Sequence, residues 1–377
     1  MNNEFDILIS QIDEHNEIEF MLINKFKIKK LITISDNKED IINFRKVFNT
    51  ISSNCMLIEE YVEEGDFNHI ESIFKRYKDK NILINLTTGK RINAFILFKL
   101  ALENNIQSIY VDLLNKRRYV LGDNSRVIVQ NLEDITIDNI ALSGGNKIIS
   151  DSCNLCLKDD VIKITNCIYN NLDLWNKYKN RLNDTSIFIH NYKDAYKLDI
   201  DCSYFDNEEI CLLNKILDEL KKMDCINYHR NNEIINVMFN NSYLKGFIFK
   251  SGTWLEILTN NVVNSIDKVD EVKNSVVFTW NEEPGVLRNE LDVIAIKDCN
   301  LVCISCKDSE KYDEKALNEL EVYSKRLGGE RTKKVLVATK EPIKSLVNDR
   351  AKEMGIHIVI LDKDIDKFKK RLSDIIG

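Results

Sequence analysis

The chain has few of the residues that usually mark domain boundaries. Only two prolines and twelve glycines occur in 377 residues. Pro and Gly are the residues that most clearly interrupt helices and strands, so the domains must be found from the pattern of apolar residues instead. A chain of this length exceeds one ordinary hydrophobic core and fits two or three domains.

Long apolar runs and an excess of positive charge are also missing. No run of apolar residues is long enough to span a bilayer, and residues 1–6 lack the basic start of a signal peptide. Sixty acidic residues outnumber 53 Lys and Arg, which gives a net charge of −7. We therefore expect a cytoplasmic protein with no membrane partner, in which nucleic acid binds only in a local cleft and with a metal ion.

The ten cysteines do not form a recognisable framework. Cys303 and Cys306 fall on opposite faces of one predicted strand, so they cannot share a metal there. Cys153 and Cys156 could bind zinc only together with cysteines further along the chain. Small apolar side chains in cores are the preferred interpretation.

The first 145 residues alternate short apolar runs with segments of helical periodicity. Strands separated by helices of this length form a parallel sheet that is covered on both faces. With right-handed crossovers, the pattern predicts an α/β, Rossmann-like, doubly wound domain. The predicted strands are 5–9, 30–34, 56–58, 81–86 and 108–111, and the predicted helices are 18–26, 40–48, 67–77 and 91–102.

Two polar loops follow strands of this sheet, at the carboxyl ends where such sheets bind ligands. The first loop contains Ser10, Gln11 and Asp13, and the second contains Thr87, Thr88, Gly89, Lys90 and Asn93. The second loop opens a helix, whose amides and dipole favour an anion. The chain has neither GxGxxG nor a P-loop, so we expect a phosphate-bearing ligand other than ATP or NAD. Alternatively, the second loop only turns the chain and its lysine is solvated.

The segment 148–243 has the least regular pattern. Its predicted helices are 172–182 and 208–223, and its predicted hairpin strands are 225–228 and 234–239. A helix followed by a hairpin could form a winged-helix-like element. Basic residues are sparse here, which argues against a DNA-reading helix. A connecting domain that positions the two ends is therefore the preferred interpretation.

The last third has a different order, with a helix, three meandering strands and then helix–strand units. This order predicts an α/β/α sandwich. A turn is predicted at 283–285. The predicted helices are 244–266 with an interruption at Gly252, 313–327 and 343–354, and the predicted strands are 275–280, 289–296, 301–307, 334–338 and 356–360.

Two neighbouring strands of this last part place an acid beside a base. Asp292 lies inside one apolar run, and Lys307 ends the next. Burying both charges is costly unless they are paired or bind something. Metal-dependent phosphodiester cleavage needs this combination, because a carboxylate holds the cation while a lysine orients the attacking water or stabilises developing negative charge.

Two further side chains can join this pair. Alternation places Ser305 on the same strand face as Lys307, and Asp292 meets them if the register allows. Glu256 lies off the apolar stripe of the preceding helix and could reach the same point. Each residue also has a simpler interpretation, as a strand cap, a snorkelling lysine or a solvated charge. Their joint occurrence in this order favours a nuclease site.

These residues resemble those of a known family. The chain is similar to the CRISPR ancillary nucleases that join a CARF domain (CRISPR-associated Rossmann fold) to a PD-(D/E)xK restriction-endonuclease-like domain. Residues 252–256 resemble the helix with the family's first acid, 289–293 its metal-binding strand, and 304–307 its (D/E)xK element. Residues 85–90 and Ser10–Gln11 resemble the CARF ligand loops.

The resemblance implies a CARF domain at 1–147, a connecting or winged-helix-like region at 148–243, and a nuclease domain at 244–377. It implies a homodimer that binds a cyclic oligoadenylate, most often the tetra-adenylate, across its two-fold axis. Binding would reposition nuclease domains that cleave DNA, RNA or both with Mn²⁺ or Mg²⁺, in type III CRISPR antiviral defence. The implied catalytic residues are Glu256, Asp292, Ser305 and Lys307.

One position departs from the family pattern. Ser305 stands where an acid is expected two residues before the lysine, and a hydroxyl is a weaker, neutral ligand for a hard cation. Glu256, Asp292 and the backbone carbonyl of Cys306 would then have to hold the metal. The departure keeps open a second function, a ligand-sensing regulator that binds nucleic acid with an inactive nuclease fold.

A third function is a ribonuclease of the HEPN type, which uses an Arg and a His on one helix. Arg350 and His357 have a matching spacing, but His357 falls in a predicted strand after Gly355. Five basic residues could line a rim that contacts a nucleic-acid backbone, or form an ordinary solvated surface. They are Lys325, Arg326, Arg331, Lys333 and Lys334.

Overall fold

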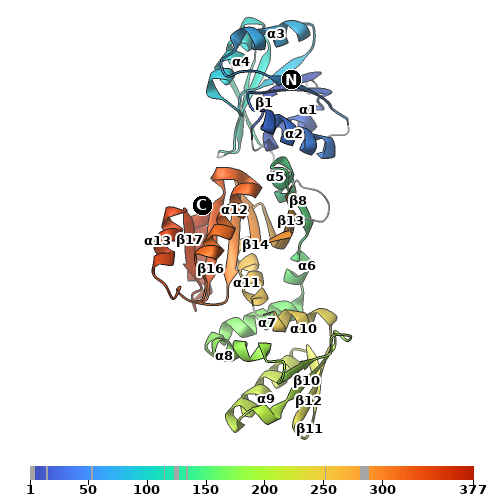
Figure 1. Ribbon diagram of the computed structural model, residues 1–377, viewed down its shortest axis with the longest axis vertical. Coiled ribbons are helices and arrows are strands. Elements are labelled where there is room, and N and C mark those ends of the chain that lie inside the picture. The colour runs from blue at the N-terminus through green and yellow to red at the C-terminus, as the bar shows by residue number, and fades with distance from the viewer. Residues whose placement is uncertain are drawn as a thin grey trace.

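The computed structural model describes residues 5–13, 16–51, 54–113, 115–122, 127–132, 135–250, 252–280 and 288–377. Three parts follow one another along the long axis of the molecule (Figure 1). The N-terminal part, in blue, lies at one end, and the C-terminal part, in orange, lies in the middle. The green segment that links them in sequence lies at the other end. The turn predicted at 283–285 falls outside the described residues.

The N-terminal part is a doubly wound sheet. Its strands are β1 (Ile7–Gln11), β2 (Lys30–Ser35), β3 (Met56–Tyr61), β4 (Ile82–Asn85), β5 (Gln107–Asp112), β6 (Arg117–Leu121) and β7 (Val127–Asn131), and its helices are α1 (Glu17–Phe26), α2 (Lys38–Ile51), α3 (Phe67–Tyr77), α4 (Arg91–Glu103) and α5 (Ile137–Ser143). The strand order is β3-β2-β1-β4-β5-β6-β7. Strands β1 to β5 are parallel, which confirms the predicted Rossmann-like topology. The antiparallel β6–β7 hairpin is absent from the predicted pattern.

The green segment forms a smaller unit around an antiparallel sheet. Its elements are α6 (Cys153–Cys156), α7 (Asp159–Asn170), α8 (Leu172–Tyr178), η2 (Lys179–Asn183), β9 (Phe188–His190), β10 (Lys197–Asp201), η3 (Cys202–Tyr204), α9 (Asn207–Lys222), β11 (Ile226–Asn231), β12 (Ile234–Phe239) and α10 (Ser242–Phe249). The sheet order is β11-β12-β10-β9, which includes the predicted hairpin and adds two strands. Asp206 and Glu209 form a capping box that fixes where α9 begins.

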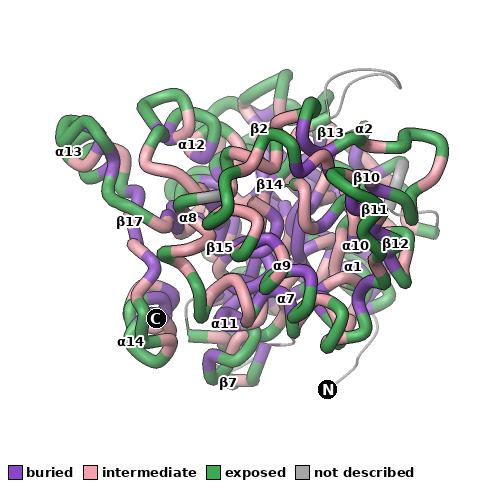
Figure 2. The backbone as a smooth tube through the Cα atoms, turned by 90° about the horizontal axis from the view of Figure 1, so that it is seen from below, coloured by how far each residue is buried: buried purple, intermediate pink, exposed green. Residues whose placement is uncertain are grey.

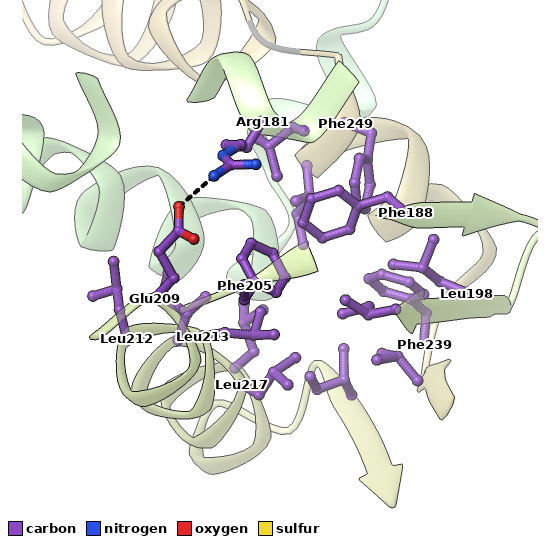
Figure 3. A pocket seen from close by; sticks show the side chains of 17 residues that line it. Arg181, Phe188, Leu198, Phe205, Glu209, Leu212, Leu213, Leu217, Phe239 and Phe249 are labelled. Atoms are coloured by element: carbon purple, nitrogen blue, oxygen red, sulfur yellow. Dashed lines mark hydrogen bonds and ion pairs between the residues drawn. The ribbon is translucent and has the colours of Figure 1, made fainter. Parts of the chain in front are cut away.

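An apolar cavity of about 100 Å³ lies between α9 and this sheet. Figure 3 shows Leu213 and Leu217 facing it from the helix, and Phe239 facing it from β12. An ion pair of 2.7 Å between Arg181 and Glu209 lies at its edge. The cavity is therefore part of the hydrophobic core of this unit and is distinct from the polar sites described below.

The C-terminal part is the predicted α/β/α sandwich. Its elements are β8 (Lys147–Ser150), α11 (Thr253–Asn264), β13 (Glu271–Thr279), β14 (Arg288–Lys297), β15 (Asn300–Lys307), α12 (Glu314–Gly328), η4 (Gly329–Arg331), β16 (Lys333–Ala338), α13 (Leu346–Glu353), β17 (Ile356–Ile360) and α14 (Ile365–Ile376). The strand order is β17-β16-β15-β14-β13-β8. The meander β13–β14–β15 is antiparallel, and β15, β16 and β17 are parallel. The pattern predicts neither β8 nor α14.

The two faces of this sheet belong to different core clusters. Cys303 packs in the cluster under α12, and Cys306 packs in the cluster under α11 and α14, as alternation predicts. The buried residues of β14 and β15 lie inside a shell of exposed helix and loop residues (Figure 2). Each fully buried Leu, Ile or Val contributes about 1.5–3 kcal/mol, so these strands are a rigid support for polar side chains at their ends.

Helix α11 is buried on all sides, which differs from the single apolar stripe predicted for it. Trp254, Leu255 and Ile257 are all nearly inaccessible to solvent. The sheet covers one side of the helix, and α6 and α7 cover the other. Glu256 is therefore buried between apolar neighbours, and the interpretation as a solvated charge is wrong.

The N-terminal and C-terminal parts meet through β8 and a set of ion pairs. Lys116 binds Asp270 at 2.8 Å, and Lys273 binds Asp138. A polar cleft of about 570 Å³ separates the two parts elsewhere, and Asp13 lies on one side of it and Arg326 on the other. In the described part of the chain, no helix combines the length and the apolarity needed to cross a membrane.

Candidate functional site

Polar side chains are buried where α11 crosses β13, β14 and β15. Glu256 comes from α11, and its Oε2 accepts a hydrogen bond of 2.9 Å from the hydroxyl of Ser275. Asp292 comes from β14, and its Oδ2 accepts from the backbone N–H of Cys306 at 2.6 Å and from the hydroxyl of Ser305 at 3.2 Å. The structure thus brings Asp292 and Ser305 together, and Glu256 and Lys307 each interact electrostatically with Asp292.

Ser275 is a residue of this cluster that the sequence pattern does not identify. It lies within β13 with a φ of 46°, in the left-handed region that costs a non-glycine residue about 1–2 kcal/mol. Its side chain is buried and directed at Glu256. Backbone strain of this kind concentrates at functional sites. The signal in the sequence is the polar pair Asn274–Ser275 directly before the apolar run Val276–Phe278.

The two carboxyl groups raise each other's cost of ionisation. Burial, and after it the negative charge of Asp292, together raise the pKa of Glu256 to about 7, against the hydrogen bond from Ser275. Burial also raises the pKa of Asp292, although Lys307 and the Cys306 N–H oppose this increase. A cation bound between the carboxylates would relieve both burial and repulsion.

The donors around this point fit a hard divalent cation. Two carboxylates with backbone oxygen and water suit Mg²⁺, which keeps several waters, and Mn²⁺, which takes the same oxygen ligands. In an extended strand the N–H and C=O of one residue point to the same side, so the Cys306 carbonyl also faces β14. No group of three or more His, Cys, Asp and Glu side chains that could hold a metal occurs in the described ranges. Cys153 and Cys156 lie in these ranges, so they do not belong to a zinc site of three or more such side chains.

The predicted ligand loops meet at the carboxyl ends of β1 and β4, where the strand order reverses. Asn85 Nδ2 donates to Ser10 Oγ at 2.9 Å, and the hydroxyls of Ser10 and Thr88 each lie 2.7 Å from Oε1 of Glu19. Glu19 is fully buried, and burial raises its pKa to about 7. The sequence pattern does not identify Glu19 as a site residue. The feature that could have identified it is an acidic residue between the apolar residues Ile18 and Phe20 of a predicted helix.

The second loop is locked against the first by close packing. Gly89 has a φ of 80°, and a Cβ placed there would lie 2.4 Å from Cβ of Gln11. The Lys90 N–H donates to Oε1 of Gln11 at 2.9 Å. Nε2 of Gln11 is then a buried donor that has no hydrogen-bond acceptor among the described residues. The loops therefore form one rigid surface with backbone and side-chain donors.

The remaining predicted loop residues mainly support the backbone. Asn93 Oδ1 accepts from the N–H of Gly65 at 2.8 Å, and Thr87 Oγ1 accepts from the N–H of Val111 at 2.9 Å. Oδ2 of Asp13 lies 3.4 Å from the Gly89 nitrogen. These contacts hold the loops after β1, β3 and β4 together at one edge of the sheet.

The basic residues proposed as a rim are largely engaged with other groups. Lys325 pairs with Glu330, Lys334 pairs with Glu321, and the Arg326 guanidinium lies 5.4 Å from the centre of the Trp280 ring. Lys333 donates to the carbonyls of Ile375 and Ile376 at 3.0 and 2.8 Å. Four of the five residues are thus engaged within the chain, and Arg331 is exposed.

The HEPN interpretation is not supported by the positions of its two residues. Arg350 lies on α13 and His357 on β17, so they do not share a helix. Arg350 forms an ion pair of 3.0 Å with Glu353 on its own helix.

Comparison with known proteins confirms the predicted resemblance. Residues 245–376 match the family described as Card1-like, endonuclease domain. No curated protein matches the chain. The matched segment begins one residue after the predicted start of the nuclease domain and contains all four predicted catalytic residues.

Solved structures show the same architecture over nearly the whole chain. Protein VC1899 from Vibrio cholerae has a TM-score of 0.74 and 17% identity, and the match covers 98% of this chain and 97% of that one. Can2 from Sulfobacillus thermosulfidooxidans, solved in complex with cyclic tetra-adenylate, has a TM-score of 0.68 and 17% identity, and the match covers 99% of both chains. A type III CRISPR defence DNA nuclease activated by cyclic oligoadenylate has a TM-score of 0.50 and 12% identity, and the match covers 91% of this chain and 47% of that one. The fold is therefore shared with these proteins.

Proposed function

We propose that this protein is a divalent-metal-dependent nuclease of type III CRISPR defence that a cyclic oligoadenylate activates. The observation that carries the proposal is the carboxylate pair of buried Glu256 and half-buried Asp292 beside Lys307, within a segment that matches an endonuclease domain. The substrate is DNA, RNA or both. A bound divalent cation supplies Lewis-acid stabilisation of the reacting phosphate and a more acidic water.

Each residue of the cluster has a distinct role in this proposal. Asp292 and Glu256 would bind the cation, and the Cys306 N–H and Ser305 hydroxyl hold one oxygen of Asp292, which leaves the other for the cation. Ser275 fixes Glu256 in the same way. Lys307 orients the attacking water and stabilises negative charge on the phosphate in the transition state. Ser305 therefore orients a ligand and need not itself replace the missing acid.

The N-terminal loops supply the activator site. Their amides at the start of α4, the Lys90 side chain and the unpartnered donor of Gln11 suit the phosphates of a cyclic oligoadenylate. The likeness to Can2, whose structure holds cyclic tetra-adenylate, favours the four-membered ring. Ser10, Thr88 and Glu19 hold this surface in shape from below.

A homodimer would place two such loop surfaces beside each other. Helix α4 starts at the second loop and leaves Ile92, Phe95 and Leu102 exposed at helical spacing, with Phe95 69% exposed. A second copy of the chain is the proposed partner for this stripe, because a symmetric ring suits an isologous interface.

Replacing Phe95 with Glu should dissociate this dimer. A charge in an apolar interface is left without a partner, so the dimer dissociation constant should rise at least roughly tenfold. Light scattering during size-exclusion chromatography gives the mass directly. Leu157→Glu is the matched control, because Leu157 is equally apolar and exposed but lies beyond α6, away from the loops. An unchanged mass for Phe95→Glu would rule out this interface.

Binding of Mn²⁺ should depend on pH through Glu256. Its pKa is raised from 4.5 to about 7, so the metal-free fold loses stability as pH rises between these values, by at most roughly 3 kcal/mol. Bound Mn²⁺ offsets the loss of stability that ionised Glu256 causes, and it competes with the proton for the Glu256 carboxylate. Thermal unfolding should therefore show a larger Mn²⁺-induced increase in melting temperature at pH 8 than at pH 6.

The variant Glu256→Gln tests the assignment of this effect. Without Mn²⁺ it should be more stable than the wild type at pH 8 and similar at pH 5, and Mn²⁺ should no longer stabilise it. Glu319→Gln, which neutralises an exposed carboxylate on α12, should behave as the wild type. Equal Mn²⁺ stabilisation of Glu256→Gln and wild type would contradict the metal site.

The proposed function is tested by incubating the full chain with cyclic tetra-adenylate and Mn²⁺. Supercoiled plasmid, single-stranded DNA and RNA are scored in parallel, with omission of the ring or of the metal as controls. Cleavage that needs both additions supports the proposal. Tight nucleic-acid binding without cleavage would instead support the regulator with an inactive nuclease fold.

A further inference from the structure

The residue that follows β15 is a buried aspartate, Asp308, whose side chain is only 3% exposed. Its Oδ2 accepts hydrogen bonds from the indole N–H of Trp175 at 2.6 Å and of Trp254 at 2.8 Å. Its Oδ1 accepts from Lys179 Nζ at 2.6 Å and from the Thr339 hydroxyl at 3.0 Å. Lys179 also donates to the Asp308 backbone oxygen at 2.6 Å.

These donors come from both sides of the candidate active site. Trp175 lies on α8 and Lys179 begins η2, so both belong to the unit formed by residues 153–249. Trp254 lies on α11, two residues before Glu256, and Asp308 itself follows Lys307. One carboxylate therefore joins that unit to the two elements that carry a metal-binding acid and the lysine.

A purely stabilising ion pair would not need this arrangement. Buried ion pairs can often be replaced by apolar residues without loss of stability. Here each oxygen of Asp308 accepts two hydrogen bonds from side chains. One of these donors, Trp254, lies two residues before Glu256, and Asp308 itself directly follows Lys307. A displacement of about 1 Å at reacting groups can cost roughly 100-fold in rate.

We propose that Asp308 is a positioning residue for phosphodiester cleavage, and that α8 and η2 belong to the active-site scaffold through it. The inference rests on the proposed nuclease function. It gives the segment between the sensing and catalytic parts a specific task, which is to hold α11 and the end of β15 at a fixed separation. The edge-to-face contact of Trp175 and Trp254, with ring centres 6.3 Å apart, makes this junction rigid.

The first test is a double variant, Trp175→Phe with Lys179→Met, which removes the hydrogen bonds that α8 and η2 donate to Asp308, leaves those from Trp254 and Thr339, and keeps most of the packing. We expect kcat to fall roughly 10- to 100-fold while KM for the nucleic acid changes less than about threefold. Tyr169→Phe is the matched control, because Tyr169 donates from the same unit to the Asp362 carbonyl at 2.8 Å, away from Asp308. The control should retain kcat.

Two comparisons separate positioning from a loss of stability. Lys179→Arg keeps the cation and should restore most of the kcat that Lys179→Met loses. Thermal unfolding measured on each variant gives the folded fraction at the assay temperature. The inference is overturned if the double variant retains the kcat of Tyr169→Phe, or if its kcat falls only as far as its folded fraction.

Fluorescence gives a readout that does not require cleavage. The chain contains three tryptophans, so Trp280→Phe leaves only the pair that binds Asp308. Mg²⁺ titration of this variant should change the emission, and adding Asp308→Asn should weaken the apparent Mg²⁺ affinity at least tenfold. If the wild type fails to cleave, the proposed function is wrong, and this titration decides the inference separately. The same Mg²⁺ response with and without Asp308→Asn overturns it.

Discussion

Replacing Asp292 with Asn should reduce activator-dependent cleavage roughly 10³-fold or more. The amide cannot supply the anionic oxygen that a divalent cation requires, and the stabilisation of the transition state is lost with the cation. The fold should survive, because the amide oxygen of Asn can still accept from the Cys306 N–H and the Ser305 hydroxyl. The rate is measured on a labelled strand with saturating Mn²⁺ and cyclic tetra-adenylate.

The matched control for Asp292→Asn is Glu290→Gln. Glu290 lies two residues earlier on β14, but its side chain is 45% exposed, where it pairs with Lys250 at 3.9 Å and adds a minor repulsion to Glu256 and Asp292. Its effect on the rate should be within a few-fold, because exposed pairs contribute little. Metal-free Asp292→Asn should melt no lower than the wild type, since burial raises the pKa of Asp292 and its charge is costly in the fold. Undiminished cleavage by Asp292→Asn would end the site assignment.

Replacing Gly89 with Ala should weaken activator binding by roughly 10- to 100-fold. The new Cβ would lie 2.4 Å from Cβ of Gln11, which real structures do not allow, so one loop must move. Left-handed backbone adds a further cost of about 1–2 kcal/mol for any residue with a side chain. Movement of Gln11 also removes the acceptor that holds the Lys90 N–H. Titration calorimetry with cyclic tetra-adenylate measures the change.

Gly355→Ala separates the effect of crowding from that of backbone conformation. Gly355 has a φ of 65°, and a Cβ there would meet nothing within 4 Å. This variant should lose some stability and keep its activator affinity. If Gly89→Ala binds the ring as tightly as the wild type, the second loop does not contribute to the activator site.

Local patterns predict much of the fold because they reflect burial directly. The central strands β1, β2 and β4 of the N-terminal sheet are buried on both faces, and a covered parallel sheet accommodates them. The interaction of Asp292 with Lys307 was predictable for a related reason, since a charge inside an apolar strand is costly without a partner. The match of residues 245–376 to an endonuclease domain agrees with that interpretation.

The features that could not be predicted depend on contacts between distant parts of the chain. Helix α11 is buried on both sides because α6 and α7, about a hundred residues earlier, pack on it. The left-handed conformation of Ser275 and the convergence of three donors on Glu19 are likewise set by tertiary packing. Asp308 follows an apolar strand. The two tryptophans that donate hydrogen bonds to it, Trp175 and Trp254, are distant in sequence, so its neighbouring residues could not indicate these contacts.

The pairing of β8 with β13 means that the sheet of the C-terminal part is not a contiguous stretch of sequence. β8 directly follows the N-terminal part in the chain, yet its residues Lys147 and Ile148 pair with the strand that carries Ser275. A fragment that begins at 245 would leave β13 as an open edge, which is a template for aggregation. Recombination that exchanges one N-terminal domain for another must therefore carry this short strand along, or replace it with one of matching register.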